Sequence, residues 1–188
     1  MLSLEQIEKW YPEGLRPFKR AMVKEYLQYK ILEIVFSSAY ASKLSFLGGT
    51  ALRLLYGNQR FSEDLDFDNF ALSETEFEDL ALFVQSGLIK EGLKVEVNTA
   101  GKEAYRCNIR FPRLLFDEGL SPHYDEKILI QIDSLACGFN YLPDRKTLNK
   151  FDVFTGVFST PADILLSQKI HASVTRKRPK GRDFYDIV

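Results

Sequence analysis

The sequence is poor in the residues that form metal sites and disulfides in many small proteins. It contains two cysteines and two histidines among 188 residues, and none of them is spaced as in a zinc site or a Cys-x-x-Cys motif. We therefore expect Cys107 and Cys137 to be reduced core residues of a cytoplasmic protein. The net charge is only −1, so any contact with RNA must come from a local basic patch rather than from an overall positive field.

Long apolar segments are also missing. The N-terminus carries Glu5, Glu8 and Lys9 where a signal peptide would be apolar, and no apolar run is long enough to span a bilayer. We therefore expect no membrane partner. The composition, 45% hydrophobic and 27% charged, is typical of one globular domain with a sizeable core.

A strand, a tight turn and a short helix are predicted in quick succession. The apolar run 44–47 indicates a buried strand, Gly48 and Gly49 follow it, and a helix is predicted from Thr50 until Gly57 ends it. Glycines at such a turn let the backbone approach a ligand closely, and the start of a helix offers unpaired N–H groups to an anion. This segment is therefore a candidate phosphate-binding element.

Acidic residues alternate with apolar ones shortly after this helix. Asp64, Asp66 and Asp68 fall on one face of a predicted strand, with Leu65 and Phe67 on the other. Carboxylates two positions apart repel each other unless a cation lies between them, and Mg²⁺ takes oxygen ligands together with substrate phosphates. An exposed strand with ordinary surface acids is the simpler alternative. The order of strand, Gly-Gly-Thr, helix and acidic strand favours a metal-assisted phosphate site.

A third candidate acid follows later in the chain. The strand predicted at 127–134 is rich in isoleucine and leucine and carries Asp133 near its end. A charge after so apolar a run is costly unless it is paired or binds a metal, the alternative being that it caps the next turn. Between the acidic segments, Arg106 and Arg110 share one face of a predicted hairpin strand, where they contact nucleic acid or a triphosphate, or are simply solvated.

The remaining pattern alternates helices with strands. Helices are predicted from Ser3 to about residue 10, over 18–41 and from Ser73 to Lys90, a hairpin over 94–99 and 104–111, and a loop before a strand at 151–158.

The C-terminal segment combines a helix with a basic stretch. Thr160 is the expected N-cap of this helix and Pro161 its first residue, and Lys169 lies near the border of its apolar face. Five basic residues then fall between positions 176 and 182. Such a stretch is either a solvated loop or a weak RNA-binding patch.

Two segments together resemble a known family. Residues 46–70, with Gly-Gly, a short helix and the Ser-x-Asp-x-Asp motif that begins at Ser62, and residues 159–188 resemble the AbiEii/AbiGii-type toxins of the polymerase-β-like nucleotidyltransferase superfamily. The resemblance implies an α/β (α+β) nucleotidyltransferase fold, a small mixed sheet flanked by helices. The core would cover 1–158, and 159–188 would start a C-terminal helical region. Family members usually continue with more helices, so we expect a short or truncated member.

The resemblance also implies which residues form the site. The metal ligands, for Mg²⁺ or Mn²⁺, would be the catalytic acids Asp64, Asp66 and Asp133. The nucleotide would be bound by Gly48, Gly49, Thr50, Ser62 and Lys169. Asp183 would orient active-site groups, and Arg182 and Asp186 are further candidates.

An enzyme of this kind would transfer a nucleoside monophosphate from an NTP to an acceptor hydroxyl. The resemblance implies a toxin of a bacterial toxin–antitoxin or phage-defence system, with RNA, in particular the 3′ end of tRNA, as acceptor and a cognate antitoxin as partner. Three alternatives stay open: nucleotide transfer (AMPylation) onto a protein side chain, a nucleotide-binding module without catalysis, and a metal-dependent nuclease.

Overall fold

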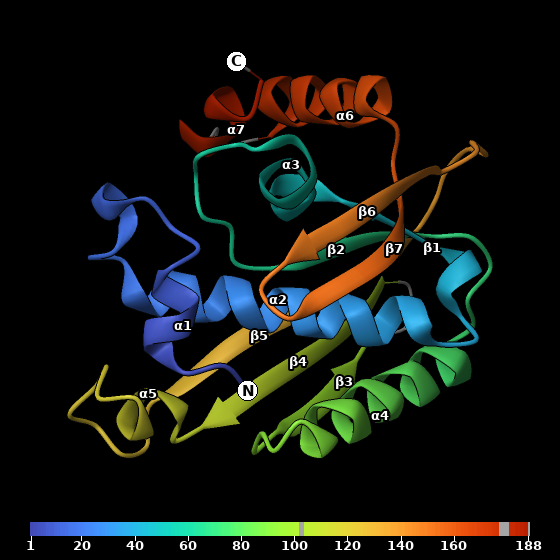
Figure 1. Ribbon diagram of the computed structural model, residues 1–188. Coiled ribbons are helices and arrows are strands. Elements are labelled where there is room, and N and C mark those ends of the chain that lie inside the picture. The colour runs from blue at the N-terminus through green and yellow to red at the C-terminus, as the bar shows by residue number, and fades with distance from the viewer. Residues whose placement is uncertain (102–103, 177–180, 188) are drawn as a thin grey trace.

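A mixed sheet of seven strands forms the centre of the molecule (Figure 1). The computed structural model describes residues 1–101, 104–176 and 181–187, without the side chain of residue 183. The strand order is β3-β4-β5-β2-β1-β7-β6. The strands are β1 (Leu44–Leu47), β2 (Leu65–Asn69), β3 (Glu96–Ala100), β4 (Ala104–Pro112), β5 (Lys127–Ala136), β6 (Asp144–Lys150) and β7 (Val153–Ser159).

Helices flank this sheet on both sides, as expected for the fold class. They are α1 (Leu4–Glu8), α2 (Lys19–Ser37), α3 (Gly48–Tyr56), α4 (Glu74–Lys90), α5 (Leu114–Asp117), α6 (Ala162–Thr175) and α7 (Gly181–Tyr185). In Figure 1, α2 crosses the middle of the molecule with α4 beside it, while α3, α6 and α7 lie beyond β2. None of the described helices is long and apolar enough to cross a membrane.

The two acidic strands are neighbours at the centre of the sheet. Strand β2 pairs antiparallel with β1 and parallel with β5, and β5 pairs antiparallel with β4 on its other side. Strand β5 is therefore inserted between β2 and β4, although it follows both in the chain. This insertion brings Asp133 beside Asp66, because the two residues are partners in the β2–β5 register.

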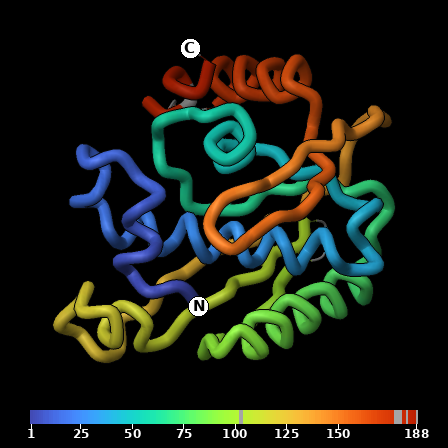
Figure 2. The backbone as a smooth tube through the Cα atoms, in the orientation of Figure 1, coloured from blue at the N-terminus to red at the C-terminus, as the bar shows by residue number. Residues whose placement is uncertain are grey.

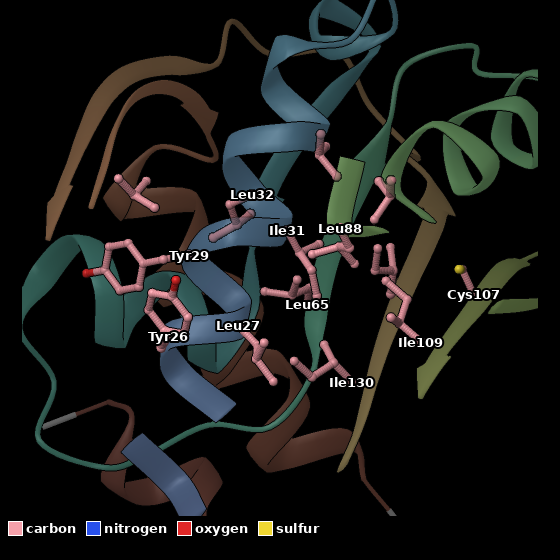
Figure 3. Close-up of a cluster of buried hydrophobic side chains, with 14 of the residues drawn as sticks. Tyr26, Leu27, Tyr29, Ile31, Leu32, Leu65, Leu88, Cys107, Ile109 and Ile130 are labelled. Carbon is pink, nitrogen blue, oxygen red and sulfur yellow. The ribbon is translucent and has the colours of Figure 1, made fainter. Parts of the chain in front are cut away.

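Packing against α2 fixes which face of β2 carries the acids. Leu27 and Ile31 of α2 point toward Leu65 of β2 and Ile130 of β5, and all four side chains are fully buried (Figure 3). Burying a leucine or isoleucine side chain stabilises the fold by about 2 kcal/mol, so a slip of one residue would be costly. Since neighbouring strand residues point to opposite faces, Asp66 is turned away from α2.

Most predicted elements are found, with two informative differences. Strand β6 is rich in polar and charged residues, and for this reason the sequence predicts a loop there. Such a composition suits an edge strand, and β6 lies at the edge of the sheet beside β7. Helix α6 begins at Ala162, and Thr160 does not cap it. Instead, the Thr160 hydroxyl hydrogen-bonds with the hydroxyls of Ser45 (3.1 Å) and Tyr141 (2.7 Å). Thr160 thus joins α6 to β1 rather than starting the helix.

Two of the predicted helix starts are found, whereas the bounds of other helices differ from the prediction. The Ser3 and Ser73 capping boxes open α1 and α4 as predicted. The long helix α2, however, ends at Ser37, short of the predicted end, and α3 begins at Gly48 rather than Thr50. The backbone trace of Figure 2 shows α6 and α7 lying against the segment that leads from α3 into β2.

Candidate active site

Most of the predicted site residues meet at one cavity on the α3 side of β2. The cavity has a volume of about 220 Å³. Its acidic lining is Glu63, Asp64, Asp66, Asp133 and Asp186. Its basic lining is Arg60, Lys169, Arg176 and Arg182. Gly49 and Ser62 complete it, so three segments far apart in the sequence (49–66, Asp133 and 169–186) form one polar site.

The acids Asp64 and Asp66 carry unfavourable charge in this cavity. Burial, followed by the charges of Asp133 and Asp64, raises the pKa of Asp66 to about 6. Burial also raises the pKa of Asp64, to which Lys24 is the strongest opposing charge. The positive charge of Lys169 offsets only part of the repulsion at Asp66. A cation placed between the carboxylates would remove this cost.

The two glycines make room for charged side chains at the start of α3. Gly48 has a φ of +84°, and a methyl group there would overlap Oδ2 of Asp66. At Gly49, a methyl group would come within 2.7 Å of the Nη2 atom of Arg60 and 3.0 Å of the Oγ atom of Ser62. Within the part of the chain that the structure describes, no side chain caps α3 at its N-terminus, so its first N–H groups are available to an anion.

Thr50 and Gln28 hold the segment that enters β2. The buried Thr50 hydroxyl donates a hydrogen bond to the carbonyl oxygen of Asp64. From α2, the Gln28 Nε2 atom donates to the carbonyl oxygens of Ser62 and Glu63, at 3.0 Å each. In this structure the Thr50 side chain therefore positions an acid; that Thr50 also contacts nucleotide stays a prediction.

Asp186 links three parts of the site through its buried carboxylate, which is 1% exposed. Lys169 of α6 donates to its Oδ2 atom at 2.8 Å, and Arg60 donates to Oδ1 from Nη2 at 3.0 Å and from Nε at 3.2 Å. Sequence reasoning missed Arg60, because an arginine in a polar turn is ordinarily solvated. The motif after the basic stretch did point to Asp186 as a further candidate.

Asp133, like Asp186, has protein donors at both of its carboxylate oxygens. The Nε atom of Arg106 donates to Oδ1 at 2.8 Å, and the Nε2 atom of Gln131 donates to Oδ2 at 2.7 Å. The interpretation of Arg106 as either solvated or a substrate contact therefore overlooked a third role. The prediction for Asp183 and most of the basic stretch, residues 177–180, lies outside the described residues.

The donor set suits a hard divalent ion that shares its ligands with a substrate. Among the described residues, no three Asp, Glu, His or Cys side chains converge into a ready-made metal cage. Asp64 and Asp66 nevertheless present two mutually repelling carboxylates to one cavity. Mg²⁺ is commonly held by one or two carboxylates, with phosphate oxygens and water completing its shell. The residues therefore fit such an ion bound together with a triphosphate.

Three solved structures share this fold, and two of them are named as nucleotidyltransferases. MenT4, a nucleotidyltransferase toxin from Mycobacterium tuberculosis, is 18% identical with a TM-score of 0.67, covering 99% of this chain and 63% of its own. A putative nucleotidyltransferase from Helicobacter pylori is 20% identical with a TM-score of 0.62, covering 89% of this chain and 66% of its own. JHP933, also from Helicobacter pylori, is 19% identical with a TM-score of 0.61, covering 89% of this chain and 64% of its own. The chain thus spans just under two thirds of the length of these proteins.

The family follows from the sequence profile. The profile described as "Nucleotidyl transferase AbiEii toxin, Type IV TA system" matches residues 30–188. The chain therefore belongs to the AbiEii family of nucleotidyltransferase toxins, as its two motifs indicated. No significant match is found among curated proteins.

Proposed function

We propose that this protein transfers a nucleoside monophosphate from an NTP to an acceptor hydroxyl, and that it acts as the toxin of a toxin–antitoxin system. The observation that carries the proposal is the meeting of opposite charges in one cavity. Asp64, Asp66 and Asp133 lie across from Lys169 and beside the uncapped start of α3. Binding a triphosphate together with a divalent cation requires both kinds of group side by side.

The reaction is a substitution at the α-phosphorus of the NTP. The acceptor hydroxyl oxygen forms a new bond to this phosphorus, and the bond from phosphorus to the oxygen that bridges the α- and β-phosphates breaks. Pyrophosphate leaves with the electron pair of that bond. The hydroxyl proton passes to a nearby carboxylate, for which Asp133 is the proposed acceptor. Such transfers depend chiefly on positioning and charge neutralisation.

The chain's own groups divide these tasks. The N–H groups at Gly49 and Thr50, with Ser62 beside them, bind phosphate oxygens. Lys169, held by Asp186, places a positive charge against the triphosphate. The ligands of Mg²⁺ or Mn²⁺ would be Asp64, Asp66 and Asp133. When bound, the ion would neutralise triphosphate charge and acidify the attacking hydroxyl.

RNA is the proposed acceptor, in particular the 3′ end of tRNA. Arg176 and Arg182 line the same cavity and are the first and last residues of the basic stretch in the C-terminal segment. Positive side chains at the mouth of an active site suit a polyanionic acceptor in a chain without overall positive charge. A cognate antitoxin is the proposed functional partner.

Labelled NTPs test the proposal directly. Each of the four α-³²P-labelled NTPs is incubated with the protein, Mg²⁺ and total RNA, and in parallel with a protein extract. We expect label on a band of tRNA size, lost in Asp64→Asn and retained in Asp125→Asn. Asp125 is exposed and is not among the residues that line the cavity, so the control removes a carboxylate charge outside the proposed site.

Other outcomes separate the alternatives. Label on protein but not on RNA would replace the RNA acceptor with a protein side chain. RNA cleavage without added NTP would indicate a nuclease. NTP binding without any transfer would leave a nucleotide-binding module and contradict the proposed activity.

A further inference from the structure

Arg106 forms an ion pair with Asp133, one of the three proposed metal ligands. Arg106 of β4 and Asp133 of β5 are direct partners in the antiparallel register, and the Arg106 Nε atom lies 2.8 Å from Oδ1 of Asp133. Gln131, two positions earlier on β5, donates to the other oxygen. For Asp64 and Asp66, by contrast, burial and neighbouring charges dominate, with no hydrogen bond among the main influences on their pKa. Asp133 is therefore paired with a positive charge, whereas Asp64 and Asp66 repel each other.

The pair formed by Arg106 and Asp133 is well placed to open. The Arg106 side chain is 54% exposed and that of Asp133 is 32% exposed. Ion pairs this accessible to water contribute little to stability, because solvent screens them and replaces them readily. The negative charge of Asp64 also acts on the Arg106 guanidinium. Arg106 is thus an exposed positive charge at the edge of the acidic cluster, and it is not part of the buried framework.

We propose that Arg106 is a displaceable counterion that competes with the divalent cation for Asp133. This inference rests on the proposed function, because it takes Asp133 to be a metal ligand. In the free protein, the guanidinium neutralises Asp133 and lowers the affinity of the acidic cluster for a metal ion. When a metal ion binds with a triphosphate, Arg106 leaves Asp133, and its guanidinium becomes available to an anionic substrate. Arg106 acts through Asp133 and is therefore a positioning residue.

The competition has a consequence that a purely structural role would lack. Removing the positive charge should strengthen metal binding in the absence of nucleotide. A residue that only supported Asp133 would instead weaken metal binding when it was removed. Arg106→Lys, which keeps the charge, should bind metal nearly as the wild type does.

Mn²⁺ titration of the nucleotide-free protein tests this, with free Mn²⁺ followed by electron paramagnetic resonance. We expect Arg106→Gln to bind Mn²⁺ about two- to fivefold more tightly than the wild type, because it loses one exposed competing ion pair. Arg110→Gln is the matched control. Arg110 lies on the same strand, where its register partners are Glu96 and Leu129, so this variant removes the same charge without touching Asp133.

The possible results separate the competition by Arg106 from the proposed metal site itself. Equal or weaker Mn²⁺ binding by Arg106→Gln would overturn the competition, as would an equal gain in Arg110→Gln, which would reveal only a general charge effect. Wild-type binding that is lost in Asp64→Asn would uphold the proposed metal site independently of Arg106. An absence of Mn²⁺ binding in every variant would overturn both the metal site and this inference.

Discussion

Replacing Asp66 with asparagine should stabilise the protein while abolishing its activity. In the wild type, burial and the charges of Asp133 and Asp64 disfavour the ionised carboxylate, which raises its pKa from 3.8 to about 6. Asparagine has nearly the same shape but no charge, so it relieves this cost. The same change removes a proposed metal ligand and should eliminate nucleotide transfer.

The size of the gain follows from the pKa. Each pKa unit corresponds to about 1.4 kcal/mol, so a rise of this extent corresponds to at most about 3 kcal/mol. Asp66 is not fully buried and is partly screened by solvent, so we expect a gain of about 2 kcal/mol in the free energy of unfolding. For a domain of this size, that is roughly 4–8 °C in Tm.

The pH dependence of the free energy of unfolding shows whether the gain comes from removing the ionised carboxylate of Asp66. Above pH 6 the wild-type carboxylate is ionised in both the folded and the unfolded state, and the full cost is present. As the pH falls from 6 toward 4, the folded state takes up its proton first, so the wild type regains stability and the advantage of Asp66→Asn fades.

Urea unfolding in EDTA at pH 8 and at pH 4 measures both effects, with Asp125→Asn as control. A gain of the same size at both pH values, or no gain at pH 8, would refute the reasoning.

Three further substitutions test the start of α3, the buried ion pair between α2 and α3, and the hydrogen bond of Thr50. Gly48→Ala should cost at least about 1 kcal/mol of stability and most of the transfer activity, because the residue has a positive φ and the added methyl group would displace Asp66; normal activity would contradict this. Glu25→Gln should lower the free energy of unfolding by about 3–5 kcal/mol, since it leaves Arg53 without its buried partner at 2.7 Å; a loss below about 1 kcal/mol in urea would exclude a tight ion pair. Thr50→Val should cost about 1 kcal/mol and reduce kcat, and unchanged kinetics would show that its hydrogen bond does not position the acids.

The centre of the fold was predictable because its signals are local. The apolar run of β1, the two glycines and the alternation after Asp64 each specify their own conformation, and together they specify which side chains share a face. The cost of a charge after an apolar strand drew attention to Asp133, and the family resemblance implied its place beside Asp64 and Asp66. The register now shows it directly opposite Asp66.

The missed features depend on partners that lie far away in the chain. Arg60 joins the site only because Asp186 folds back onto it, and nothing in its neighbouring sequence indicates that contact. Arg106 was one of two similar arginines on a strand, and only the pairing of β4 with β5 selects it. Strand β6 was missed because an edge strand tolerates the polar composition of a loop.

The insertion of β5 between β2 and β4 also governs when the acidic cluster can form during protein synthesis. A nascent chain that has reached β4 can pair β1 with β2 and β3 with β4, but these two parts of the sheet have no direct contact as neighbours. Only when β5 has left the ribosome can it enter between them and bring Asp133 beside Asp66. Such non-local pairing forms late and slowly. Asp64 and Asp66 therefore lack Asp133 beside them until β5 has been made.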